Sequence, residues 1–204
     1  MGDDNATATS RPPRILAMLS GGGRTLLNLL DAIERGDLDA RVAGVVASRD
    51  CAGVGRAAAR GLPVRVERGA LPGKRLLQIV REHEARWIVL CGYLQKIDLP
   101  PELDGRVVNI HPALLPKFGG PGMYGDRVHA AVLEAGETES GCTVHLCDAN
   151  YDTGPMVLQR RCPVHPDDTV ESLAARVFEL ECKAYPDALS ILLSRDSSAQ
   201  EVGR

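Results

Sequence analysis

The sequence has few aromatic residues, little net charge and no long apolar run. Phe, Trp and Tyr make up only 3% of the 204 residues, so Leu, Val, Ile and Ala must supply the core. The net charge of −3 argues against a nucleic-acid surface, which would require a basic face. No apolar run approaches the roughly 20 residues of a membrane-spanning helix. We therefore expect a cytoplasmic protein that binds small molecules and has no nucleic-acid or membrane partner.

Metal-binding and secretion signals are also missing. None of the six cysteines forms a Cys-x-x-Cys pair, and no Cys/His group has the spacing of a zinc site. We expect reduced cysteines, several of them buried in apolar strands, and no metal. Residues 1–13 lack a basic start and an apolar core, so they predict a disordered tail and not a signal peptide. Residues 14–193 suit one domain, and the polar residues 194–204 predict a frayed tail.

Apolar segments alternate with helical patterns along residues 15–111. Continuous apolar runs such as residues 15–19 are typical of parallel strands buried on both faces. Later, segments 142–146 and 156–160 flank a turn and should pair as an antiparallel ribbon. A helix is expected over 169–193, kinked or split at Pro186. The predicted fold is α/β: a single Rossmann-like domain with a mostly parallel sheet, helices on both faces and an antiparallel C-terminal strand pair.

A glycine-rich loop, SGGGRT at residues 20–25, follows the first predicted strand and leads into a predicted helix. Glycines let a ligand approach the backbone, and a helix N-terminus offers free N–H groups to an anion. The loop lacks the Gly-Lys-Ser/Thr of a Walker A motif and the full spacing of the dinucleotide fingerprint. Taken alone, it fits a phosphate site and a plain connector equally well.

Asn109 and His111 lie at the carboxyl end of another predicted strand. Pro112 cannot donate to a central ladder, so the strand should end there. The period of two places both side chains on one side of the strand. Ligands of open α/β sheets bind at this end. By residue type alone, a strand-end histidine is more often structural, and an Asp before Thr-Gly-Pro, such as Asp152, usually forms a turn.

Together these motifs resemble the folate-dependent formyltransferases, which take a one-carbon unit from 10-formyltetrahydrofolate. That family has Asn-x-His on a strand end, a Leu-Leu-Pro loop and a distant Asp in a turn. The matching residues are Asn109, His111, Leu114, Leu115, Pro116 and Asp152, with Lys117 similar to the glycinamide ribonucleotide branch. The resemblance is nearly collinear from about residue 14 to residue 193. It implies an enzyme of de novo purine (IMP) biosynthesis that transfers the formyl group of 10-formyltetrahydrofolate, a co-substrate, to the amino group of 5'-phosphoribosylglycinamide.

The resemblance also implies roles for individual residues. Asn109 and a protonated His111 would stabilise the oxyanion, while Asp152 keeps His111 charged and guides a proton through water. The residues implied to bind the ribonucleotide are Gly23, Arg24, Thr25, Leu26, Leu27, Asn109 and Glu181. The residues implied to bind folate are Leu94, Gln95, Lys96, Ile97, Asp148, Ala149, Asn150, Tyr151 and Asp152.

Several alternatives stay open at this point. The resemblance leaves three candidates for the contact to the folate tail, namely Arg68, Lys74 and Arg75. His145 fits both a place near the site and a purely structural role. The acceptor could be an amino-sugar nucleotide, and a non-catalytic nucleotide-binding module would need only the glycine loop. The chain has no room for the RNA-binding domain of methionyl-tRNA formyltransferases, and it lacks the regulatory domain of the formyltetrahydrofolate hydrolases. A monomer and a homodimer are both compatible with the sequence.

Overall fold

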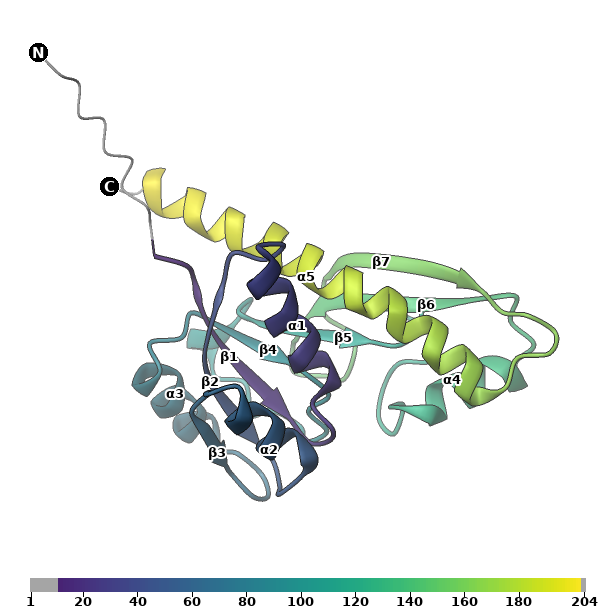
Figure 1. Cartoon of the computed structure of the whole chain (residues 1–204), viewed down its shortest axis with the longest axis horizontal. Coiled ribbons are helices and arrows are strands. Elements are labelled where there is room, and N and C mark those ends of the chain that lie inside the picture. The colour runs from purple at the N-terminus through teal and green to yellow at the C-terminus, as the bar shows by residue number, and fades with distance from the viewer. Residues whose placement is uncertain (1–10, 203–204) are drawn as a thin grey trace, which may run out of the picture.

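The computed structural model describes residues 11–202, with side chains up to residue 196, so residues 1–10 of the expected N-terminal tail lie outside the described part. Its seven strands form one sheet in the order β3-β2-β1-β4-β5-β6-β7 (Figure 1). The strands are β1 (Arg14–Leu19), β2 (Arg41–Ala47), β3 (Val64–Val66), β4 (Trp87–Leu90), β5 (Val107–His111), β6 (Glu139–Leu146) and β7 (Met156–Pro163). The helices are α1 (Arg24–Arg35), α2 (Ala52–Ala59), α3 (Gly73–Glu82), the 3-10 helix η1 (Pro101–Leu103), α4 (Asp126–Glu134) and α5 (Val170–Val202).

The sheet is parallel from β3 to β5 and antiparallel at its other edge. β1 pairs with β2 on one side and with β4 on the other, and β5 continues the parallel part. β6 pairs antiparallel with β5 and with β7. The prediction of a mostly parallel Rossmann-like sheet with an antiparallel C-terminal pair is confirmed.

Alternate residues of the central strand β1 face two separate cores. Ile15, Ala17 and Leu19 join a core that includes buried residues of α1, α2, α4 and α5. Leu16 and Met18 pack on the opposite face with residues of α3. Because both faces of the strand are covered by helices, its sequence is continuously apolar.

Helix α5 runs the length of the sheet beside α1 (Figure 1). It stays one helix through Pro186, so it is not split there, and it continues to Val202, beyond the predicted end at residue 193. A proline removes the hydrogen bond to the carbonyl four residues earlier, which here is Cys182. Asn28 of α1 donates to that carbonyl at 2.9 Å, which provides the missing partner.

Tyr185 fixes α5 to the middle of the sheet. Its side chain is fully buried, and its hydroxyl lies 2.9 Å from the Leu90 carbonyl and 3.0 Å from the Val108 carbonyl. The helix therefore lies across β4 and β5 close to the strand end that carries Asn109. This contact carries α5 residues such as Glu181 to the edge of the sheet where the glycine loop lies.

The six cysteines are free, and Cys91, Cys142 and Cys162 are buried, as the sequence predicted. Within residues 11–202, no helix combines the length and apolarity needed to cross a membrane. The same residues contain no group of three His, Cys, Asp or Glu side chains placed to hold a metal ion.

Candidate active site

Ser20 holds the glycine loop at the carboxyl end of β1. Its hydroxyl lies 2.7 Å from the Ser48 hydroxyl and accepts the Leu94 N–H at 2.8 Å. Its carbonyl accepts the Nε–H of Arg49 at 2.8 Å. These bonds join the ends of β1, β2 and β4, so the loop has a fixed place next to the segment that was expected to bind folate.

Gly23 turns the loop into helix α1. It has a φ of 75°, which favours glycine, and a Cβ there would lie 3.0 Å from the Gly53 Cα. The first hydrogen bond of the helix runs from the Leu27 N–H to the Gly23 carbonyl. The N–H groups of Arg24, Thr25 and Leu26 precede that bond and have no acceptor within the helix. This arrangement suits an anion.

Asn109 and His111 both line a cavity of about 400 Å³ at the strand ends. Asn109 is half-buried, whereas His111 is buried. In the antiparallel register, Asn109 lies opposite His145, and His111 lies opposite Thr143. Two histidines therefore come together from neighbouring strands, and the open question about His145 is answered by this register: its side chain lies within the cluster.

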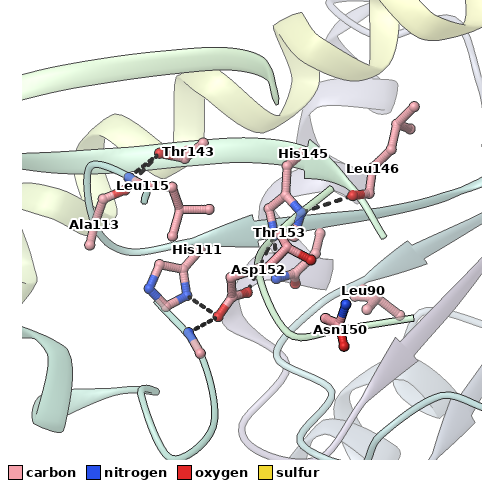
Figure 2. A network of polar contacts seen from close by, with 12 residues as sticks. Leu90, His111, Ala113, Leu115, Thr143, His145, Leu146, Asn150, Asp152 and Thr153 are labelled. Atoms are coloured by element: carbon pink, nitrogen blue, oxygen red, sulfur yellow. Dashed lines mark hydrogen bonds and ion pairs between the residues drawn. The ribbon is translucent and has the colours of Figure 1, made fainter. Parts of the chain in front are cut away.

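The carboxylate of Asp152 lies between the two histidines (Figure 2). Its Oδ2 is 3.6 Å from the Nδ1 of His111 and accepts the Gly120 N–H at 2.9 Å. Its Oδ1 is 3.4 Å from the Nε2 of His145. Asp152 has a φ of 57°, so the turn before Gly154 holds this residue in a left-handed conformation that points its side chain at the cluster.

His145 orients the carboxamide of Asn109. The Nδ1 of His145 lies 3.0 Å from the Leu146 carbonyl, which requires a donor, so Nδ1 carries the hydrogen. In the neutral ring, Nε2 then accepts from the Asn109 Nδ2 at 3.2 Å. The carboxamide is thereby fixed with one N–H directed at His145 and a second N–H left for a ligand.

Burial and charge oppose each other at this cluster. Burial lowers the pKa of His111 below its usual 6.5, although the negative charge of Asp152 and the Phe118 carbonyl both act to raise it. For Asp152, burial would raise the pKa, but the neighbouring His145 ring and the charge of His111 hold it below 3.8. At neutral pH the site therefore contains ionised Asp152 and largely neutral His111. Asp152 acts on His111 in the expected direction but does not keep it charged.

A second network fixes the segment between His111 and Phe118. The Thr143 hydroxyl donates to the Ala113 carbonyl at 2.7 Å and accepts the Leu115 N–H at 3.1 Å (Figure 2). This segment returns the Phe118 carbonyl to the His111 Nε2 at 2.7 Å. Both ring nitrogens of His111 thus have protein partners, which hold the ring in one orientation.

A second cavity, of about 80 Å³, adjoins the first. Asn109 and Asp152 line both cavities, together with Tyr93 and Tyr151. The first cavity includes the predicted residues Arg24, Thr25, Leu94, Asn109, His111, Tyr151, Asp152 and Glu181. The second includes Gln95, Lys96, Ile97, Asn109, Asp148, Ala149, Asn150, Tyr151 and Asp152.

Three of the predicted ribonucleotide residues do not line either cavity. Leu26 is buried in the core and Leu27 packs against it, so their side chains cannot reach a ligand. The Leu27 N–H is already bonded to Gly23. Gly23 and Leu26 can contribute only through the backbone. Leu27 has neither a free backbone donor nor an exposed side chain, because its helical position turns it toward the core.

None of the three arginine and lysine candidates for the folate tail lines a cavity. Arg68 pairs with Asp50, and Arg75 donates to Glu67 at 2.7 Å. Lys74 is exposed on α3. Lys96, by contrast, lines the second cavity and the open groove beside it.

Several lining residues carry no signal in the sequence. His129, on α4, is buried, and its Nδ1 has no hydrogen-bond partner among the described residues. Phe178 and Val177, on α5, form part of the cavity wall. Their helical periodicity indicates a core face and does not distinguish a cavity wall from a packed core.

The family of this chain follows from comparison with known proteins. The family described as "Formyl transferase" matches residues 13–189. The chain belongs to the formyl transferase family. Asn109, His111 and Asp152 lie within the matched part, as do the glycine loop and Glu181.

Individual relatives cover most of this formyl transferase chain. It is 36% identical over 196 residues to the chloroplastic phosphoribosylglycinamide formyltransferase of Vigna unguiculata, covering 92% of this chain and 63% of that protein. It is 33% identical over 210 residues to the chloroplastic enzyme of the same name from Arabidopsis thaliana, covering 98% and 72%. The chain thus spans less than two thirds of the Vigna relative's length.

A solved structure agrees with the fold. Glycinamide ribonucleotide transformylase 1 from Symbiobacterium toebii has a TM-score of 0.82 and 31% identity to this chain, covering 95% of this chain and 93% of that one. The formyl transferase fold therefore extends over nearly the whole described sheet and its helices.

Proposed function

We propose that this chain transfers the formyl group of 10-formyltetrahydrofolate to the amino group of glycinamide ribonucleotide. The observation that carries the proposal is the place of Asn109 and Asp152, which line both cavities. One cavity extends to Arg24 at the glycine loop, and the other is lined by residues 95–97 and 147–152. Two substrates would meet at this carboxamide and carboxylate. The names of the plant and bacterial relatives agree with these two substrates.

The reaction is an acyl transfer through a tetrahedral oxyanion. The acceptor's amine attacks the formyl carbon, the new C–N bond forms, and the bond from that carbon to N10 of the folate breaks. The remaining N–H of Asn109 would donate to the oxyanion, since His145 fixes the direction of the carboxamide. No side-chain nucleophile is needed, because the amine itself attacks.

The proton lost by the attacking amine must reach N10 of the leaving folate. A largely neutral His111 beside an ionised Asp152 can take up one proton. The resulting imidazolium would be stabilised by the Asp152 charge and by the Phe118 carbonyl, which accepts from Nε2. We therefore assign proton transfer to this pair, with a water able to bridge it to the substrates, in place of the expected role of a protonated His111.

Residues at the ends of the first cavity suit the phosphate and the ribose of the ribonucleotide. The N–H groups at the start of α1 and the Arg24 guanidinium would bind its phosphate. Burial raises the pKa of Glu181 to about 8, against the opposing charge of Arg24. A neutral carboxyl can donate as well as accept, which suits a ribose hydroxyl.

The second cavity suits a pterin. Tyr151 presents an exposed ring to it, and Ile97 is half-buried in its wall. Leu94, also exposed, lines the adjoining first cavity. The backbone of residues 94–97 and 148–152 would supply the polar contacts, since pockets for small molecules commonly combine apolar walls with a few placed polar groups.

Turnover of 10-formyltetrahydrofolate with glycinamide ribonucleotide, compared with an amino-sugar nucleotide, tests the proposal. We expect formylation of the ribonucleotide and none of the amino sugar. Folded protein that leaves the folate unchanged with the ribonucleotide would contradict it. A reaction with the amino-sugar nucleotide alone would establish the alternative acceptor, and binding without turnover would indicate a non-catalytic module.

We also propose a cytoplasmic location and a monomeric or homodimeric state. The six free cysteines support a reducing compartment. The plant relatives are named chloroplastic, so fractionation of the source cells is the deciding measurement. Sedimentation equilibrium would separate a monomer from a dimer and from larger assemblies.

A further inference from the structure

Arg24 and Phe178 form a close contact between the first and last helices. Arg24 begins α1, and Phe178 lies on α5. The guanidinium carbon of Arg24 lies 3.8 Å from the centroid of the Phe178 ring. Both residues line the first cavity, where Phe178 is half-buried and Arg24 is exposed. The geometry is that of a cation resting on the face of an aromatic ring.

The Arg24 guanidinium keeps its hydrogen-bond donors available. Across residues 11–196 its side chain has no hydrogen bond or ion pair; it contacts the Phe178 ring and acts on Glu181 only through its charge. A planar guanidinium stacked on a ring can still present its N–H edge to an anion. Arg24 is also the one arginine or lysine among the described residues that line this cavity.

The other arginines near the glycine loop are already occupied. Arg49 donates to the Ser20 carbonyl, and Arg56 donates to the Gly22 carbonyl at 2.7 Å. They brace the loop from outside the cavity. The charge that faces a ligand is therefore the one that rests on Phe178.

Glu181 explains why the position of Arg24 matters. It lies three residues after Phe178 on α5, so the two side chains share a helix face, and it lines the same cavity. An arginine released from the ring could turn toward Glu181 and favour its ionised form, which would cancel the positive charge. Free arginine side chains also lose rotamer freedom when they bind an anion, and a preformed stack reduces that loss.

We propose that Phe178 is a positioning residue for the phosphate of the acceptor. Its ring holds the Arg24 guanidinium at the N-terminus of α1, where the N–H groups of Arg24, Thr25 and Leu26 have no acceptor within the helix. Phe178 does not itself bind the phosphate but acts through Arg24. The identity of the ligand as a ribonucleotide phosphate rests on the proposed function, whereas the stack does not.

The test compares Phe178→Leu, Phe178→Tyr, Arg24→Ala and the Arg24→Ala/Phe178→Leu double variant in the full chain. We expect Phe178→Leu to raise KM for glycinamide ribonucleotide about two- to fivefold, the range for a cation–ring contact at an exposed site, with kcat and the folate KM unchanged. Phe178→Tyr, which keeps a ring, should restore KM. Phe178→Leu should have no further effect once Arg24 is removed.

Leu180→Ala is the matched control for a loosened α5, because Leu180 is half-buried on the same helix and packs on the core. It should lower Tm without changing KM. An unchanged KM in Phe178→Leu, or an equal effect of that substitution with and without Arg24, would overturn the proposal.

Calorimetric binding of ribose 5-phosphate separates this inference from the proposed function. Binding that weakens in Phe178→Leu and Arg24→Ala would support the positioning role even in a protein that fails to formylate glycinamide ribonucleotide. Binding that is equal in wild type and Phe178→Leu would overturn it, whatever the turnover.

Discussion

Asp152 and His111 are the residues whose chemistry depends most on their surroundings. The carboxylate contacts His111, His145 and the Gly120 N–H, and it stays ionised although it is half-buried. His111 receives a stabilising charge from Asp152, yet burial has the larger effect on its pKa. The pair can therefore hold one additional proton, which is what the proposed transfer between two nitrogens requires.

Substitution of the pair should lower kcat and leave binding nearly intact. Asp152→Asn removes the charge that stabilises the imidazolium, so we expect a loss on the order of 10²–10³ in kcat, as for other single electrostatic groups. His111→Ala should lose at least as much. Because the groups act as a unit, the double variant should lose little more than the worse single one. Steady-state kinetics of the three variants measure this, and fully multiplicative losses would contradict a shared role.

The pH dependence tests the protonation state directly. Since burial lowers the pKa of His111, the neutral form that the proposed mechanism requires persists below pH 6.5 and is lost as the pH falls through the lowered pKa. The acid limb of kcat/KM should therefore lie below pH 6.5. In Asp152→Asn it should move to still lower pH, because the imidazolium loses its counter-charge. A limb that moves upward in this variant would mean that another group titrates.

At the scale of the elements, helix α5 keeps its continuity with help from α1. Pro186 cannot donate to the Cys182 carbonyl, and Asn28 donates there in its place. The same contact holds α1 against α5, so the helix that begins at the glycine loop and the helix that carries Glu181 stay together. The hydrogen bond that compensates for Pro186 in α5 therefore also links α5 to α1.

Asn28→Ala should destabilise the fold by about 1–2 kcal/mol, since it leaves a carbonyl without its partner. In a Pro186→Ala background, the new N–H at position 186 can donate to Cys182, and the same substitution should be less damaging. Equilibrium urea unfolding of the two singles and the double gives the coupling free energy. Equal losses in both backgrounds would show that Asn28 contributes in another way.

At the scale of the whole molecule, α5 is fixed near both ends of the strands. Tyr185 reaches the carbonyls of β4 and β5 close to the site, while Asp196 lies near the first residues of those strands. The Asp196 carboxylate accepts from Trp87 Nε1 at 3.3 Å and pairs with Arg106 at 3.3 Å and Arg86 at 2.9 Å. One helix therefore ties the N-terminal ends of β4 and β5 to the part of the sheet that carries the site.

Asp196→Ala should lower stability by about 1–2 kcal/mol without changing kcat or KM. The side chain is only 15% exposed and has three partners, so its loss should exceed that of an isolated surface ion pair. Asp187→Ala is the matched control, because Asp187 pairs with Arg160 on the exposed face of the same helix and should matter little. Similar Tm values for the two variants, or a fall in kcat for Asp196→Ala, would contradict this reading.

The sequence by itself determined the order of the elements and part of the site. Continuous apolar runs specify buried parallel strands, and the period of two places Asn109 and His111 on one side of β5. Pro112 marks the end of that strand, and the glycines mark the loop before α1. These signals are local, since each depends only on residues that are close neighbours in the sequence. They also gave the antiparallel pair, although β6 and β7 are longer than predicted.

Only the tertiary structure decided which distant residues meet. The β5–β6 register brings His145 to Asn109, and no local pattern specifies that alignment. The crossing of α1 and α5 places Phe178 beneath Arg24 and Asn28 at Cys182. The same packing turns Leu27, which the resemblance had assigned to the ligand, toward the core, and burial lowers the pKa of His111. Packing between elements, unlike strand period or turn chemistry, depends on the whole chain at once.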